Sequence, residues 1–222
     1  NEGDIAGYAA EITDDLPEGL LFLPDNELNV TYRWKMIDEN GNETQNLEEA
    51  VKVTTDYLSK EQEETEGENL LDAYDKELGI TSTNPDYRDV KIAFKVIEPN
   101  TSDKILTNIA QISEDTDEDG NPVDDEDSTP GNDDMEEDDI DEEHVKLVYF
   151  DLALRKFITK VDNLEINNRY PVPTMGEDGN IVYNHTKDPV EVENGDIVTY
   201  TIRVYNEGEI AGYASEITDD LP

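Results

Sequence analysis

Hydrophobic and polar side chains alternate along much of the chain, and this two-residue period predicts β-strands. In the clearest stretch Val198, Tyr200, Ile202 and Val204 point one way, and the residues between them are polar. Strands are also predicted within 12–16, 29–36, 51–58, 90–96, 105–113 and 152–158. Turn residues at 174–180 predict a hairpin.

One segment departs from the strand period. Leu71, Tyr74 and Leu78 fall at helical spacing in an acidic context, which predicts a short surface helix within 61–78. The predicted fold is therefore all-β with a short helical insertion.

One segment of 17 residues occurs twice. Residues 1–17 read NEGDIAGYAAEITDDLP and residues 206–222 read NEGEIAGYASEITDDLP, so that only two positions differ. The offset of 205 residues is the period of a repeat, and it predicts an array of similar units.

Three polar residues occupy positions where the alternation predicts apolar side chains. Asp14 shares its phase with Ile12 and Leu16, Asn108 lies in an apolar row, and Lys156 lies between Leu154 and Ile158. Each has a purely structural interpretation, such as a hydrogen bond to a nearby loop or a lysine whose amine reaches solvent. Buried polar groups without such partners are costly, so the competing hypothesis is that such a residue is used in chemistry.

Composition excludes several functional classes. The net charge is −42, so nucleic acid and anionic membranes are very poor partners. Cysteine is absent, and therefore disulfides do not stabilise the fold. The two histidines, His144 and His185, are isolated, and we find no hydrolase triad, phosphate loop or zinc motif. We therefore expect no enzymatic activity.

The segment 114–143 carries 18 acidic residues in 30 and no basic one. Such runs are usually solvated linkers. Within it, DTDEDGNPVDDE fits the calcium-loop pattern, in which Gly120 makes the sharp turn. The ligands predicted for Ca²⁺ are Asp115, Asp117, Asp119, Asn121 and Glu126. A bound ion would turn the acidic linker into a stiff joint.

Several stretches together resemble the repeat unit of Gram-positive surface proteins. They are FDLALRKFITKV, VENGDIVTYTIRVYNEG and EITDDLPEGLLFLP, followed by TNIAQIS and an acidic segment. The chain is similar to conserved-repeat domains and to fimbrial domains that form internal isopeptide bonds. The order matches when the unit is read from about Val145 through Pro222 and on into the equivalent of 18–143. The resemblance implies an immunoglobulin-like β-sandwich in an extracellular stalk, fimbria or pilus attached to the cell wall or cell surface.

The resemblance also implies one role for the three misplaced polar residues. In that family a strand lysine attacks a strand asparagine, assisted by an aspartate, and the matching positions are Lys156, Asn108, and Asp14 or its repeat Asp219. Burial favours the neutral amine and the protonated acid that this reaction needs. Asp15 and Lys160 are the substitutes if the assumed strand phase is wrong.

The repeat divides the chain into three predicted parts. Residues 1–113 finish one sandwich, 114–145 form the acidic inter-repeat linker, and 146–222 begin the next sandwich. Lys156 then lies with Asp219, and Asn108 lies with Asp14. A bond between Lys156 and Asn108 therefore requires either that the two parts of the chain close on each other or that neighbouring copies, arranged head to tail, complement one another by strand addition.

We expect a structural repeat of a cell-surface fibre. One alternative is an adhesin that binds a host protein or glycan through its loops or through the segment 38–90. A second is a non-catalytic module of a secreted enzyme that degrades glycans.

Overall fold

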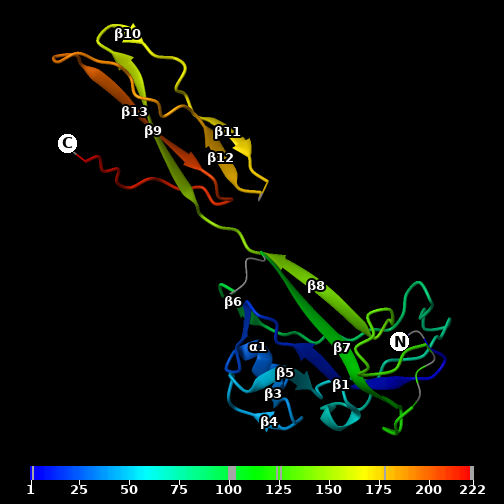
Figure 1. The fold of residues 1–222 in the computed structure, drawn as a ribbon. Helices are drawn as coiled ribbons and strands as arrows, with labels where there is room; N and C mark the ends of the chain where they lie inside the picture. The colour runs from blue at the N-terminus through cyan, green and yellow to red at the C-terminus, as the bar shows by residue number, and fades with distance from the viewer. Residues whose placement is uncertain (2, 100–103, 124, 126, 178, 221–222) are drawn as a thin grey trace. The chain divides into compact units, whose positions relative to one another are not determined.

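The computed structural model describes residues 1–222 except 2, 100–103, 124, 126, 178 and 221–222. It divides into two units, unit 1 (1–147) and unit 2 (148–222), which we describe separately (Figure 1). Both consist largely of antiparallel β-sheet, which confirms the all-β prediction. No helix in the described residues is long and apolar enough to cross a membrane.

Unit 1 is built on a six-stranded antiparallel sheet with the strand order β4-β3-β5-β1-β7-β8. The strands are β1 (Gly7–Asp15), β3 (Lys35–Asp38), β4 (Glu43–Thr44), β5 (Ala50–Thr55), β7 (Ile105–Asp117) and β8 (Ile140–Lys146). Within the first copy of the repeated segment, β1 therefore lies inside the sheet, because it pairs with β5 on one side and with β7 on the other.

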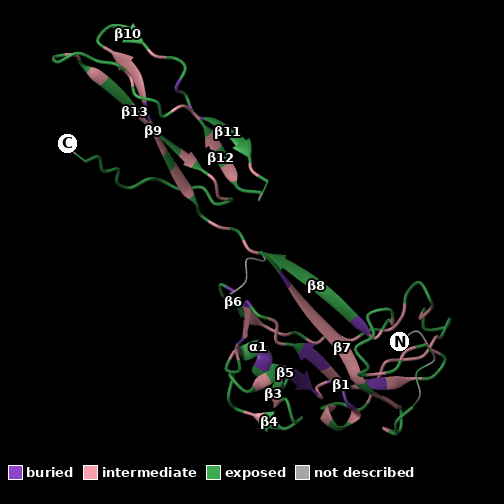
Figure 2. Ribbon diagram, viewed as in Figure 1, coloured by how far each residue is buried: buried purple, intermediate pink, exposed green. Residues whose placement is uncertain are grey.

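A second layer covers one face of this sheet. It contains the antiparallel pair β2 (Leu20–Phe22) and β6 (Phe94–Val96) and the short helix α1 (Glu27–Thr31). Phe22, Trp34, Met36 and Val53 form the buried cluster, to which Ile12, Ile92 and Phe94 add half-buried contacts. Figure 2 shows that the buried positions gather in this unit. Asp14 belongs to the strand that presents Ile12 to this core.

The predicted strand at 29–36 begins only at Lys35, because helix α1 precedes it. The side chain of Asn26 caps the helix by accepting a hydrogen bond from the Leu28 amide at 3.0 Å. The Asn29 amide group donates to the carbonyl oxygens of Leu23 and Ala93, both at 2.8 Å, and accepts from the Ala93 amide. This clamp to a residue 64 positions away fixes the helix, which strand periodicity does not reveal.

The predicted helix within 61–78 is wrong. The segment holds a 3₁₀ turn at Lys60–Gln62 and continues as turns, with an isolated bridge between Leu71 and Gly7. The Arg88 guanidinium donates to the carbonyl oxygens of Glu68 and Leu70, which an α-helix would use internally. These tertiary hydrogen bonds replace the helical ones.

The acidic segment belongs to unit 1. Its first residues, Glu114–Asp117, continue β7, and Ile140–Lys146 return as β8 along the same strand. The register runs from Ile105 opposite Lys146 to Gln111 opposite Ile140. The structure therefore divides the chain after Leu147, and the predicted boundaries at 113 and 145 fall within the unit 1 sheet.

Unit 2 contains a three-stranded sheet with the order β10-β9-β13 and a separate hairpin. The strands are β9 (Leu152–Val161), β10 (Leu164–Glu165), β13 (Val198–Asn206), β11 (Val172–Met175) and β12 (Ile181–Asn184). The β11–β12 hairpin was predicted from the turn at 174–180. Beyond β13 the second copy of the repeated segment is not in a strand at any position from 207 to 220.

Candidate cross-linking site

Asp14 is a buried carboxyl group in the middle of the unit 1 sheet. Its Cα lies opposite Val53 of β5 and Ala110 of β7, and the residue is 3% exposed. Burial raises the pKa of Asp14 from 3.8 to about 7, with a smaller contribution from the charge of Asp15 and an opposing one from the Asn108 hydrogen bond. A large share of Asp14 is therefore protonated near neutral pH.

Asn108 is the partner of Asp14. Its Nδ2 lies 3.0 Å from each carboxylate oxygen of Asp14, across 94 residues of sequence. Its Oδ1 is buried and has no hydrogen-bond partner in the described part of the chain. A carboxamide oxygen left without a donor is costly, so Asn108 is stabilised less fully than its contact with Asp14 alone suggests.

Lys156 lies on β9 opposite Ile202 of β13. Its Nζ donates to both carboxylate oxygens of Asp219, at 2.5 and 2.6 Å, and lies 4.6 Å from the centre of the Tyr200 ring. The Lys156 side chain is 36% exposed and that of Asp219 is 50% exposed. The contact between the Lys156 amine and the Tyr200 ring was not predicted from the sequence.

The phase of Lys156 differs from the predicted one. The alternation predicts that Lys156 lies in a buried apolar row. In the structure β9 buries the opposite face through Phe157, and Leu154 is 45% exposed. The ring centre of Phe157 lies 5.4 Å from that of Tyr170 and 6.4 Å from that of His185. These rings cover the face of β9 that carries Phe157. The Lys156 face is the less covered side of unit 2.

The structure thus brings the predicted residues together in two pairs, Asp14 with Asn108 and Lys156 with Asp219. The substitutes lie elsewhere: Asp15 is exposed at the end of β1, and Lys160 lies 3.8 Å from Glu165. Asp14 and Asp219 occupy the same position of the repeated segment. One repeat position therefore contacts the asparagine in one copy and the lysine in the other.

Three of the predicted calcium ligands, Asp117, Asp119 and Asn121, form a turn. The Asp117 carboxylate accepts hydrogen bonds from the amides of Asp119 at 2.9 Å and Asn121 at 2.8 Å, and these bonds lower its pKa. Asp115 lies in β7, and Glu126 lies outside the described residues. Among described residues no group of three or more acidic, histidine or cysteine side chains is placed to hold a metal. Calcium binding stays a prediction.

A second turn, at 38–42, has nearly the same sequence and hydrogen bonds as the turn at 117–121. At Asp38–Asn42 the sequence DENGN repeats the spacing of DEDGN at 117–121. The Asp38 carboxylate accepts from the amides of Asn40 and Asn42, both at 2.8 Å. The aspartate, glycine and asparagine therefore have a role in both turns without an ion.

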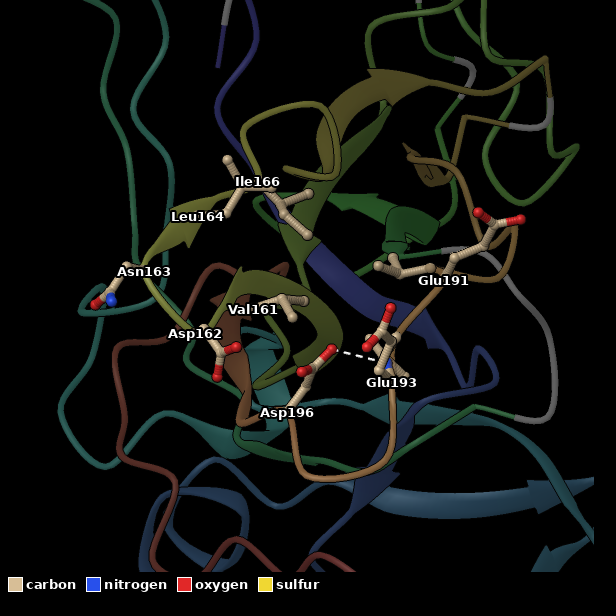
Figure 3. Close-up of a pocket in the computed structure, with 10 residues that line it drawn as sticks. Val161, Asp162, Asn163, Leu164, Ile166, Glu191, Glu193 and Asp196 are labelled. Carbon is tan, nitrogen blue, oxygen red and sulfur yellow. Dashed lines mark hydrogen bonds between the residues drawn. The ribbon is translucent and has the colours of Figure 1, made fainter.

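Two hollows on the surface of unit 2 are lined by described residues. The larger, about 800 Å³, lies at the β9–β10 end and is lined by Asp162, Leu164, Glu193, Asp196 and neighbours (Figure 3). There the Glu193 amide donates to Asp196 at 2.7 Å. The smaller, about 300 Å³, lies beside Lys156 and is lined by Lys156, Phe157, Arg169, Lys187 and Tyr200, among others. Only the smaller hollow adjoins a predicted site residue.

Comparisons of the chain with protein-family models, with curated proteins and with solved structures gave no match.

Proposed function

We propose that the chain is a structural repeat of an extracellular, cell-surface fibre, stalk or fimbria, in which a Lys–Asn isopeptide bond closes each immunoglobulin-like sandwich. One observation carries this proposal: the repeated aspartate contacts Asn108 in one copy and Lys156 in the other. A complete repeat has only one such aspartate, so both partners meet at the same carboxyl group. The protein then has no catalytic turnover.

The period defines how the partners meet. In an array with a period of 205 residues, the equivalent of Glu18 would follow the second copy of the repeated segment. Unit 2 of one copy and residues 18–147 of the next then form one sandwich. In it Asp219 takes the place of Asp14 in β1, and the neighbouring copies are the partners of this chain.

The chemistry balances without a cofactor. The neutral Lys156 amine attacks Cγ of the next copy's Asn108 equivalent. The protonated aspartate, which contacts the amide nitrogen in this chain, turns to donate to the amide oxygen. A new C–N bond forms, the bond from Cγ to the amide nitrogen breaks, and ammonia leaves with the proton that the lysine gives up. The raised pKa of Asp14 supplies the protonated acid that this step requires.

The bond suits a fibre under tension. It joins strands from opposite ends of a repeat and therefore restricts the unfolded chain as a disulfide does. For a loop of roughly 100 residues or more, this stabilises the folded state by about 4 to 5 kcal/mol. It needs no oxidising partner, which agrees with the absence of cysteine. Tension along the chain would be carried by covalent bonds between the linked strands.

The test uses a joined chain in which residues 148–222 are followed directly by residues 18–147. We expect the folded joined chain to be lighter than its sequence mass by one ammonia. Its tryptic digest should hold a branched peptide that links Lys156 to the peptide containing Asn108. Lys156→Arg and Asn108→Ala should each restore the full mass, and Asp219→Ala should do so without unfolding the chain. A folded joined chain of full sequence mass would refute the proposal.

A further inference from the structure

Strand β8 is a weakly attached edge of the unit 1 sheet. It pairs with β7 through its backbone, but of its seven residues only Ile140 is buried. The Asp141 carboxylate accepts from the amide of Glu142, and the Glu143 carboxylate accepts from that of His144, so both bond within β8. The Thr107 hydroxyl lies 2.9 Å from Nδ1 of His144 across the pair. An edge strand that buries so little side-chain surface separates at lower cost than a central strand.

The side chains of β8 also fit β7 poorly on the Asn108 face. Leu106, Asn108 and Ala110 lie opposite Val145, Glu143 and Asp141, in that order. The buried Oδ1 of Asn108 needs a hydrogen-bond donor, and the residue opposite is a carboxylate, which has none to give when ionised. Two acidic side chains thus lie beside a largely apolar row.

Strand β9 has the pattern that this edge lacks. Leu154, Lys156 and Ile158 place an amine between two apolar residues, as Asn108 lies between Leu106 and Ala110. With Lys156 opposite Asn108 the amine supplies the missing donor, and the apolar side chains meet each other. Since β8 is acidic and β9 is basic, exchanging β8 for β9 replaces acidic side chains beside Asn108 with basic ones.

The edge of β9 that faces away from β13 is open to such pairing. In the described residues β10 pairs with that edge only at Lys160 and Val161, and no strand pairs with it before Lys160. The carbonyl of Lys156 instead accepts a hydrogen bond from the Lys187 amine at 2.8 Å. A strand amide can take the place of this exposed side-chain donor when a strand is added to the edge.

We propose that β8 is a replaceable edge strand, and that β9 of a second copy displaces it from β7 with Lys156 opposite Asn108. The part of this inference that concerns the cross-link rests on the proposed function. The pairing itself does not, because it follows from register, charge and the unpartnered amide oxygen. In the absence of a partner, the acidic β8 shields the β7 edge from unspecific strand pairing.

A disulfide trap tests the pairing without any isopeptide chemistry. The chain has no cysteine, so single-cysteine chains report one contact each. A full chain with Arg155→Cys is mixed under mild oxidation with a full chain carrying Thr107→Cys or Ile109→Cys. If Lys156 lies opposite Asn108, residue 155 lies opposite 107 in a parallel pair and opposite 109 in an antiparallel pair.

We expect one of these two mixtures to give the mixed disulfide dimer at least tenfold faster than the control mixture, in which Thr174→Cys on exposed β11 replaces Arg155→Cys. Equal rates in all mixtures would overturn the proposal. A full chain carrying both cysteines that closes only within itself would overturn the role of a second copy.

A lock on β8 tests its displacement. Thr107→Cys and His144→Cys in one full chain join opposite positions of β7 and β8. We expect covalent dimers that survive reduction, each lighter by one ammonia, to form from the reduced chain and to be lost in the oxidised chain. Dimers from both forms would leave the proposed function intact and overturn the role of β8. Dimers from neither would count against the proposed function, and the disulfide trap would then decide the pairing by itself.

Discussion

The two copies of the repeated segment have nearly the same sequence and different structures. In the first copy Tyr8 is 5% exposed and Asp14 is 3% exposed, and both lie in β1. In the second copy the equivalent Tyr213 is 94% exposed, and no strand forms between 207 and 220. The difference lies in the neighbours, since β5 and β7 flank only the first copy. Strand structure here depends on context more than on local propensity.

The same comparison explains the chemistry of the aspartate. Within the sheet, burial raises the pKa of Asp14 to about 7. In the second copy Asp219 is half-exposed and is held by the Lys156 amine. The repeated position is therefore a buried carboxyl group with a raised pKa beside an amide in one setting, and a half-exposed group that accepts from an amine in the other. The proposed isopeptide reaction uses both contacts of this position.

The largest expected effect concerns Asp14 and pH. Its folded pKa of about 7 lies above the unfolded value of 3.8, so the protonated form stabilises unit 1 at low pH and this stabilisation is lost as pH rises through 7. Asp14→Asn keeps the shape and removes the titration. From pH 4 to pH 8, the free energy of unfolding should therefore fall by about 4 kcal/mol more in the wild type than in Asp14→Asn.

Urea unfolding followed by the fluorescence of Trp34, the single tryptophan of the chain, measures this effect in unit 1. Asp219→Asn is the matched control, and should leave the unfolding of unit 1 unchanged at both pH values. A pH dependence that is the same in wild type and Asp14→Asn would show that Asp14 is not buried as described.

The next effect tests whether context makes the strand. Tyr8→Ala removes a buried ring and should destabilise unit 1 by about 3 kcal/mol, whereas Tyr213→Ala should change its stability by less than about 0.5 kcal/mol. In the joined chain defined above, Tyr213 enters the β1 position. There Tyr213→Ala should cost as much as Tyr8→Ala does in the original chain. Trp34 fluorescence again reports the transition.

Much of the site was predictable because its residues broke a pattern. Asp14 and Asn108 each interrupt an apolar row, and two such rows on neighbouring strands must face the same side of the sheet. The pairing of Asp14 with Asn108 follows from that parity. The covered face of β9 was not predictable, because it depends on how Tyr170 and His185 pack against Phe157.

The errors elsewhere come from long-range contacts. Helix α1 depends on the hydrogen bonds between Asn29 and Ala93, and the missing helix near 71 depends on Arg88. Neither partner is visible within a local window. The turn at Asp117 could have been found from the similar turn at Asp38, which lacks the rest of the calcium pattern.

Calcium gives a third comparison, between the turns at Asp117 and Asp38. If Asp115, Asp117, Asp119, Asn121 and Glu126 bind Ca²⁺, an ion at 100 times its Kd should stabilise unit 1 by about 2.7 kcal/mol, and chelation should reverse this. Asp117→Asn should abolish the calcium dependence, and Asp38→Asn should retain it. Calcium binding would be contradicted if calorimetric titration at low salt gave no heat of binding and chelator left the melting temperature unchanged. The role of these residues would then be to form the turn.

The smallest expected effect concerns the sequence difference between the copies. The copies differ at Asp4, which is exposed, and at Ala10, which lies at a register shift between Ala9 and Glu11 in the pairing of β1 with β7. A bulge position of this kind accepts a small polar side chain, so Ala10→Ser should change the unfolding free energy of unit 1 by less than about 0.5 kcal/mol. Ser215→Ala should leave the second copy as exposed as before. Hydrogen exchange of the amides in both segments measures this directly. If Ala10→Ser opened β1, or Ser215→Ala protected the second copy, the structural difference would come from sequence and not from the neighbouring strands.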